Sequence, residues 1–234
     1  MATDSPIKLT PAPAHGGRLS NVLVETLIVG PIQTNCYIVV CEDTRRAAVI
    51  DPGWSAPTIL AAVESLNARV GLILLTHAHF DHIGAVADIV DATKAPLALH
   101  PLDLPLLRAD GGARAFNLPI RPAPDPDLSL DHGQILEVGT LRFETRFAPG
   151  HTPGHVVFYL ENAGTHFSER AVLGGDVLFQ GSIGRTDFPG GDLDTLIASI
   201  RNQLLTLPDD VVVYPGHGPP TTIGEERLNN PFLV

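Results

Sequence analysis

Residues 76–82, THAHFDH, place three histidines and an aspartate within six consecutive positions. They follow the apolar run VGLILL at 70–75, which predicts a buried strand ending at the motif. His77 and His79 are two residues apart, so in extended backbone their side chains point to the same side. Asp81 and His82 follow, where the chain turns toward a predicted helix. Neutral imidazole and carboxylate are ligands for zinc, manganese and iron, so this stretch predicts half of a metal site.

Three further residues occur in the same setting, at or just after other apolar runs. His151 lies in FAPGHTPGH, Asp176 ends AVLGGD, and His217 lies in VVVYPGHG. Loops at strand ends can bring distant parts of a chain together. Seven candidate ligands result: His77, His79, Asp81, His82, His151, Asp176 and His217. They are too many for one closed tetrahedral site, so the pattern predicts two neighbouring metals that share a carboxylate.

The composition indicates a globular protein and argues against a nucleic-acid-binding or membrane protein. The chain has 234 residues, of which 44% are hydrophobic, enough to bury a sizeable core. A net charge of −11 opposes a general role in binding nucleic acid. No stretch approaches the roughly 18 continuous apolar residues of a membrane helix. Residues 1–18 are rich in Pro and Gly and lack a secretory signal, so we expect a disordered leader on a cytoplasmic protein.

The order of the expected elements indicates the fold class. Strands are predicted at 21–30, 36–41, 46–51, 70–75 and 95–100, with helices at 56–68, 83–93 and 101–109. After an irregular stretch at 109–127, strands are predicted at 134–139, 140–148, 155–160, 171–176 and 210–216, with helices at 192–207 and 224–230. Each half runs from strands through a helix to a strand. This predicts one domain over 19–234, an α/β fold with two mixed sheets packed face to face and helices outside, an αββα sandwich.

The cysteines provide a local test of the strand assignment. Cys36 and Cys41 are the only two and lie on one predicted strand at odd spacing. Their side chains should therefore point to opposite faces and form no disulfide.

The motifs THAHFDH, PGHTPGH, GGDVLF and YPGHG, in this order, resemble the metallo-β-lactamase fold hydrolases over roughly residues 20–233. The resemblance implies that His77, His79 and His151 hold metal 1. It implies that Asp81, His82 and His217 hold metal 2, and that Asp176 bridges the two. The segment GSIGRTDFPGGD at 181–192 and the C-terminal segment look like the short, single-domain glyoxalase II-like (hydroxyacylglutathione hydrolase-like) enzymes of bacteria.

That subgroup implies hydrolysis of a small-molecule thioester such as S-lactoylglutathione. The reaction would use a hydroxide held between two divalent ions, with zinc expected and iron or manganese as alternatives. Asp81 and Asp176 are the predicted catalytic residues, because they would keep that hydroxide oriented. Neither the physiological thiol nor the oligomeric state follows from the sequence.

Three other residues are predicted around the ligands. Arg185 is a candidate clamp for a substrate carboxylate, or else an ion-pair partner of Asp187. These two residues stand where the two-domain glyoxalase II enzymes place a Lys and a Tyr that contact glutathione. Asp51, in a turn after a strand, is expected to hydrogen bond to a ligand. For His155 a structural hydrogen-bonding role is favoured over ligation.

Alternative functions share the same residues. The segment GRTDF is also similar to the persulfide dioxygenases, which would bind a single iron through His77, His151 and Asp176. Lactonases and RNA-processing nucleases share the HxHxDH core, and the acidic composition disfavours the nuclease. A metal-binding protein without enzymatic activity is the alternative from a different class.

Overall fold

The computed structural model describes residues 22–161 and 170–234, so the predicted leader at 1–18 lies outside the described residues. Within these ranges the chain forms two six-stranded sheets and a two-stranded hairpin. The first sheet has the order β1 (Val22–Val29), β2 (Thr34–Cys41), β3 (Arg46–Ile50), β4 (Arg69–Leu74), β5 (Leu97–Leu99) and β6 (Leu128–Ser129). The second has the order β14 (Thr221–Thr222), β13 (Val212–Pro215), β10 (Arg170–Gly175), β9 (Val156–Glu161), β8 (Leu141–Phe147) and β7 (Ile135–Val138). The hairpin pairs β11 (Leu178–Phe179) with β12 (Ser182–Ile183).

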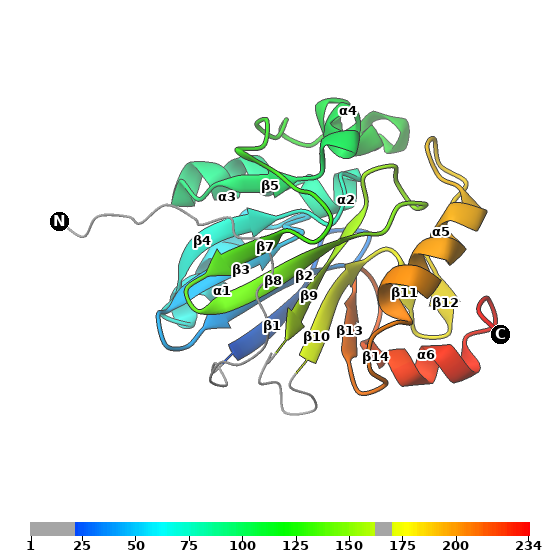
Figure 1. The fold of residues 1–234 in the computed structure, drawn as a ribbon. Helices are drawn as coiled ribbons and strands as arrows, with labels where there is room; N and C mark the ends of the chain where they lie inside the picture. Colours follow the sequence, from blue (N-terminus) through cyan, green and yellow to red (C-terminus); the bar gives the residue numbers. More distant parts are fainter. Residues whose placement is uncertain (1–21, 162–169) are drawn as a thin grey trace.

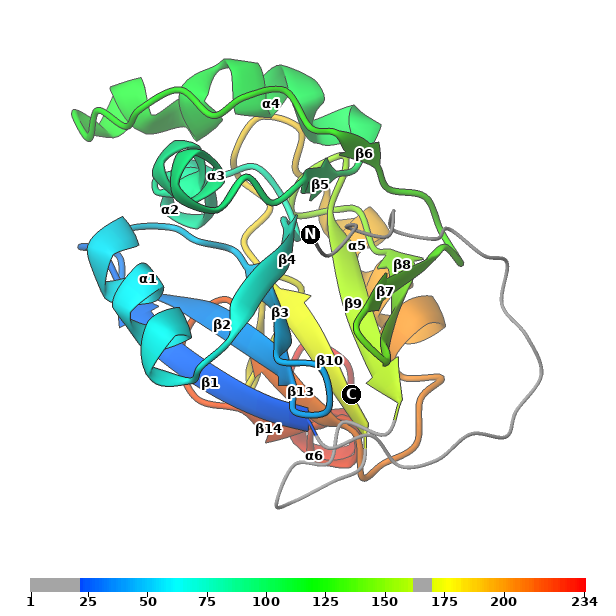
Figure 2. The same ribbon diagram turned by 90° about the vertical axis from the view of Figure 1, so that its left-hand side faces the viewer.

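Both sheets are mixed. In the first, β1 to β3 are antiparallel and β3 to β6 are parallel. In the second, β10 and β13 are parallel and the other pairs are antiparallel. The helices are α1 (Ala56–Ser65), α2 (Phe80–Ile83), α3 (Val86–Thr93), α4 (Leu104–Arg108), α5 (Leu193–Ser199) and α6 (Ile223–Asn229). Figures 1 and 2 show α1 and α3 on the outer side of the first sheet and α5 on the outer side of the second. The predicted αββα sandwich is confirmed.

Three hydrophobic clusters separate the four layers. One lies between the first sheet and α1 and α3, one between the two sheets, and one between the second sheet and the C-terminal helices. Cys36 belongs to the first of these clusters and Cys41 to the second, so the two side chains of β2 point to opposite faces, as predicted. Both cysteines are buried and unpaired. Phe143 and Phe158 are fully buried between the sheets.

The structure differs from the sequence prediction where elements are short or irregular. A four-residue helix, α2, begins at Phe80 inside the HxHxDH motif. The stretch predicted as irregular contains 3₁₀ turns over Asp110–Phe116, kinked where Gly111 and Gly112 adopt positive φ angles. The predicted helix at 192–207 is α5 followed by a π-helical turn at Ile200–Leu204. The two-residue strands β6, β11, β12 and β14 were not predicted, because alternation of side chains needs a longer run.

The two sheets are joined at the edge where the parallel strands end. The backbone N–H of Val156, at the start of β9, donates to the carbonyl of Thr76, which follows β4 (2.8 Å). The N–H of Asn35, in β2, donates to the carbonyl of Gly216, which follows β13 (2.7 Å). Thr34 pairs with His217 in an isolated antiparallel bridge. These bonds bring the predicted ligand loops of both sheets to one edge.

None of the helices in the described part of the chain is long and apolar enough to cross a membrane.

Replacing Phe158 by Ala should lower the free energy of unfolding by about 3–5 kcal/mol, because it opens a cavity between the sheets. Denaturant unfolding measures this change. The matched control is Phe232→Ala, at a residue that is 51% exposed, which should change stability by less than about 0.5 kcal/mol. A similar change for both variants would contradict the packing described here.

Candidate metal centre

The predicted ligands converge from four loops at the joined edge of the sheets. Four of them lie in the segment that follows β4. The other three, His151, Asp176 and His217, follow β8, β10 and β13, respectively. In each of two groups, His77, His79 and His151, and then Asp81, His82 and His217, the ligand atoms lie within 4.8 Å of one another. These are the sets that the family resemblance assigned to metal 1 and metal 2. The first group is buried, whereas Asp81 and His217 leave the second partly open to solvent.

Asp176 lies between the two groups. Its Oδ1 is 3.5 Å from Nε2 of His82, and its Oδ2 is 3.6 Å from Nε2 of both His151 and His217. Ligand atoms about 2.0–2.2 Å from one ion lie roughly 3.3–3.5 Å apart in tetrahedral coordination. The observed separations therefore suit ligands of a common ion, and the single carboxylate reaches both groups.

The residues present fit divalent metal ions. Nε2 of His77, Nε2 of His82 and Oδ1 of Asp176 are buried and have no hydrogen-bond partner among the described residues. Buried polar atoms without partners are rare and call for an explanation such as an ion. In addition, Nδ1 of His79 lies only 2.9 Å from Nε2 of His151. The atoms left over are imidazole nitrogens and carboxylate oxygens, the donor set for zinc, iron and manganese.

Asp51 and Thr76 orient one ligand of each group. Asp51 is buried, and its Oδ2 lies 3.0 Å from Nδ1 of His82 and accepts from the Thr76 hydroxyl (2.6 Å). The Thr76 hydroxyl lies 3.0 Å from Nδ1 of His77. Because that hydroxyl donates to Asp51, it accepts from the His77 ring. Because Nδ1 of each ring is engaged in this way, Nε2 is the atom of His77 and of His82 that is left to bind a metal. Asp51 thus lies where the sequence predicted a residue that supports ligands.

His151 and His155 are oriented by backbone groups. Nδ1 of His151 lies 2.8 Å from the carbonyl of Arg185, which leaves Nε2 facing His79. Nε2 of His155 accepts a hydrogen bond from the backbone N–H of Asp176 (3.0 Å). The His155 ring also stacks on His77, with ring centroids 4.8 Å apart. These contacts agree with a structural role for His155, since they hold the backbone of Asp176 and the ring of His77.

The two groups differ in their electrostatics. Burial, reinforced by neighbouring imidazoles, holds the pKa of His77 well below its usual value and lowers the pKa of His79 to about 3. Burial also disfavours protonated His82, but Asp176, Asp81 and Asp51 outweigh it and raise the pKa of His82 to about 10. His77 and His79 therefore offer neutral nitrogens in the first group. The second group has an excess of negative charge that a cation can neutralise.

Glycines allow the loops to approach this closely. A Cβ at Gly216 would lie 2.1 Å from Oδ1 of Asp176, and one at Gly53 would lie 1.6 Å from the carbonyl of Asp81. Both positions need a residue without a side chain for steric reasons. The motif YPGHG therefore contributes a close backbone approach at Gly216 as well as the proposed ligand His217, and IDPG contributes one at Gly53 next to the supporting residue Asp51.

Aromatic rings and a paired arginine lie beside His79. Phe188 packs edge-on against His79, with ring centroids 5.6 Å apart, and Phe116 lies next to Phe188 at 5.9 Å. The Arg185 guanidinium stacks on the Phe188 ring at 3.8 Å. It also forms two 2.7 Å hydrogen bonds with the Asp187 carboxylate. Of the two predicted roles of Arg185, the ion pair with Asp187 is present, and the pair lies beside the candidate metal centre.

Four residues of the site were not identified from the sequence. The Thr34 hydroxyl lies 3.2 Å from Oδ2 of Asp81, and Thr76 links Asp51 to His77. Phe188 contacts His79, and Phe116 contacts Phe188. Thr76 directly precedes His77, and this adjacency was a usable signal. The other three become neighbours of the ligands only through contacts between segments distant in the chain.

Comparisons with known proteins agree with this geometry. Residues 29–217 match the family model described as the Metallo-beta-lactamase superfamily. The chain is 40% identical over 213 residues to the hydroxyacylglutathione hydrolase GloC of Haemophilus influenzae, an alignment that covers 90% of this chain and 97% of that protein.

Two solved structures are similar along the whole length of their chains. The BLEG-1 B3 metallo-beta-lactamase has 41% identity and a TM-score of 0.83, with 91% of this chain and 100% of that chain covered. TTHA1623, solved in a di-iron-bound form, has 44% identity and a TM-score of 0.79, with 90% and 100% covered. Fold, ligand motifs and relatives agree, and the chain belongs to the metallo-β-lactamase superfamily.

Proposed function

We propose that this chain is a metal-dependent hydrolase of thioesters, with a glutathione thioester such as S-lactoylglutathione as its substrate. The observation that carries the proposal is Asp176, whose two oxygens reach both ligand groups. Two ions joined by one carboxylate are typical of hydrolytic centres. The 40% identity to a hydroxyacylglutathione hydrolase over nearly its whole length supports the thioester as substrate class.

The proposed ligands and Asp81 have separate roles in the reaction. His77, His79 and His151 would hold one ion and Asp81, His82 and His217 the other, with Asp176 shared. When bound, such ions lower the pKa of water and polarise a carbonyl group. Burial would raise the pKa of Asp81, but His82 and His217 outweigh it and hold that pKa far below its usual value. Asp81 therefore stays ionised at neutral pH and can accept a hydrogen bond from the attacking water.

The leaving group needs little help from the protein. A thiol has a pKa near 8.5, so a thiolate leaves without a strong general acid. The aromatic rings of Phe188 and Phe116 flank the approach to His79 and offer an apolar surface to the substrate. The Arg185 guanidinium, which stacks on Phe188, can bind a substrate carboxylate when its hydrogen bonds to Asp187 break.

A second candidate is an iron-dependent dioxygenase of persulfides. His151 and Asp176 lie 3.6 Å apart next to His77, which supplies two imidazoles and a carboxylate for a single iron. The relative TTHA1623 was solved with two irons bound, which supports iron as a metal for this donor set but not a single-iron site. The two candidates differ in a measurable way, since the hydrolase consumes water and the dioxygenase consumes oxygen.

The purified, metal-loaded protein should release thiol from S-lactoylglutathione without consuming oxygen. Changing Asp176 to Asn should lower kcat/KM at least roughly tenfold, because even residues outside the coordination shell often cost that much. The control Asp88→Asn alters an exposed residue of α3 and should leave the rate unchanged. Oxygen uptake with glutathione persulfide and no thioester cleavage would replace the proposal by the dioxygenase. Absence of both activities with zinc, iron or manganese would leave a metal-binding protein without enzymatic activity.

Asp81→Ala should remove one of two bound ions and leave the other, because Asp81 belongs only to the second ligand group. Elemental analysis of the purified variant measures this directly. Asp88→Ala is the matched control and should retain both ions. Equal loss of both ions from Asp81→Ala would contradict the division into two groups.

Asp187→Asn should lower KM for a glutathione thioester, because it frees Arg185 to pair with a substrate carboxylate. The Arg185–Asp187 pair is exposed, and such pairs contribute about 0–1 kcal/mol, so the change should not exceed roughly fivefold. Arg185→Ala should raise KM for the same substrate. An uncharged N-acetylcysteamine thioester is the control and should respond to neither change. Equal effects on both substrates would contradict a clamp for a carboxylate.

A further inference from the structure

Asp103 is a fully buried carboxylate (0% exposed) outside the two ligand groups. It ends the 3₁₀ turn Pro101–Asp103, which connects β5 to α4. A buried carboxylate is costly unless several hydrogen bonds compensate for its lost hydration. Its partners therefore indicate why it is there.

Among the described residues, the Asp103 carboxylate accepts three hydrogen bonds, all from the two loops that carry His77, His79 and His151. Oδ2 accepts from the backbone N–H of Ala78 (3.0 Å) and from the hydroxyl of Thr152 (2.8 Å). Oδ1 accepts from the backbone N–H of Gly154 (2.6 Å). Ala78 lies between His77 and His79, and Thr152 directly follows His151. One carboxylate thus connects the loop after β4 in one sheet to the loop after β8 in the other.

The contact requires a carboxylate and a nearby glycine. Hydrogen bonds to an ionised acceptor are roughly twice as strong as those between neutral groups. Both oxygens of Asp103 face donors, so an amide at this position would direct its NH₂ group at a donor. A Cβ at Gly154 would lie 2.7 Å from Oδ1 of Asp103, so only glycine allows the loop to come this close.

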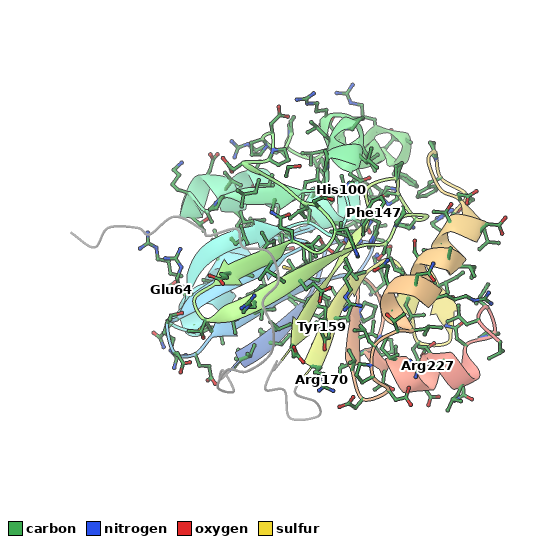
Figure 3. The ribbon with its side chains drawn as sticks, viewed as in Figure 1. Glu64, His100, Phe147, Tyr159, Arg170 and Arg227 are labelled. Atoms are coloured by element: carbon green, nitrogen blue, oxygen red, sulfur yellow. The ribbon has the colours of Figure 1, made fainter. Side chains whose placement is uncertain are left out.

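The turn that carries Asp103 is itself attached to both sheets. Nδ1 of His100 accepts from the N–H of Leu102 (3.3 Å), and the His100 carbonyl accepts from the N–H of Asp103 (3.0 Å). The His100 ring stacks on Phe147, the last residue of β8, with centroids 4.5 Å apart; both are labelled in Figure 3. Asp103 is therefore held at a fixed position relative to the loop that follows β8.

We propose that Asp103 is a positioning residue that sets the spacing of His77, His79 and His151 and thereby the affinity of the chain for metal 1. The inference rests on the proposed metal-binding role of those three histidines. Asp103 acts through the backbone of the ligand loops and contacts neither substrate nor ion. Its role is distinct from that of Asp51, which accepts hydrogen bonds from a ligand ring and from Thr76.

The test measures metal affinity in protein that already carries Asp81→Ala, so that the retained ion reports metal 1. Zn²⁺ affinity is measured by competition with a chromophoric chelator, and the absorption spectrum of bound Co²⁺ reports the ligand geometry. Asp103→Asn should weaken Zn²⁺ binding at least about tenfold, as is common when a group that orients ligands is lost, and should change the Co²⁺ spectrum. Thr152→Val removes one of the three hydrogen bonds and should give a smaller change in the same direction.

Glu226→Gln is the matched control. Glu226 is equally buried (1% exposed) and accepts three hydrogen bonds, from Thr221, Gly181 and Asn230. The Glu226→Gln variant should have a lower free energy of unfolding but the same Zn²⁺ affinity as the Asp81→Ala parent. The proposal is overturned if Asp103→Asn keeps the parent affinity and spectrum, or if Glu226→Gln weakens Zn²⁺ binding as much.

The Asp103→Asn variant could fail to fold, and the Asp81→Ala parent could fail to bind metal. If Asp103→Asn does not fold, Thr152→Val decides, and an unchanged affinity and spectrum would overturn the proposal. If the Asp81→Ala parent binds no metal, the assignment of metal 1 fails first, which separates failure of the proposed function from failure of the role of Asp103.

Discussion

The site depends on hydrogen bonds that join the ends of the two sheets. Val156 donates to Thr76, and Asn35 donates to Gly216, so the ends of β4 and β13 are each tied to the opposite sheet. Four of the ligands come from a loop of the first sheet and three from loops of the second. Each ligand group therefore contains residues from both sheets. If the sheets were displaced relative to each other, both groups would be broken.

Hydrogen bonds from three residues, Asp51, Thr76 and His155, orient the proposed ligands at the joined edge of the sheets. Asp51 orients His82 directly and His77 through Thr76, and His155 orients the backbone of Asp176. Burial lowers the pKa of His77 and of His79 in the first group, whereas the carboxylates of Asp176, Asp81 and Asp51 surround His82 and raise its pKa. Nε2 of His77, Nε2 of His82 and Oδ1 of Asp176 are buried without hydrogen-bond partners among the described residues, and all three belong to proposed ligands. Together these features suit the binding of divalent cations.

The sequence predicted the layered fold and the set of converging residues, because both follow from long apolar runs with ligands at their ends. The structure places all seven proposed ligands together, and it places Asp51 and His155 in contact with them. The sequence could not predict contacts between residues that lie far apart in the chain. Asp103 follows an ordinary strand, and its importance appears only when the loops of Ala78 and Gly154 meet it. Likewise, Arg185 had two equal interpretations until its pairing with Asp187 and its stacking on Phe188 were seen.

The central claim is that two ions share Asp176. Anomalous X-ray diffraction from crystals of the zinc-loaded protein, recorded on both sides of the zinc absorption edge, tests it most directly. We expect two zinc positions, one among His77, His79 and His151 and one among Asp81, His82 and His217, with Asp176 contacting both. A single ion bound by His77, His151 and Asp176, with no density at the second group, would contradict it.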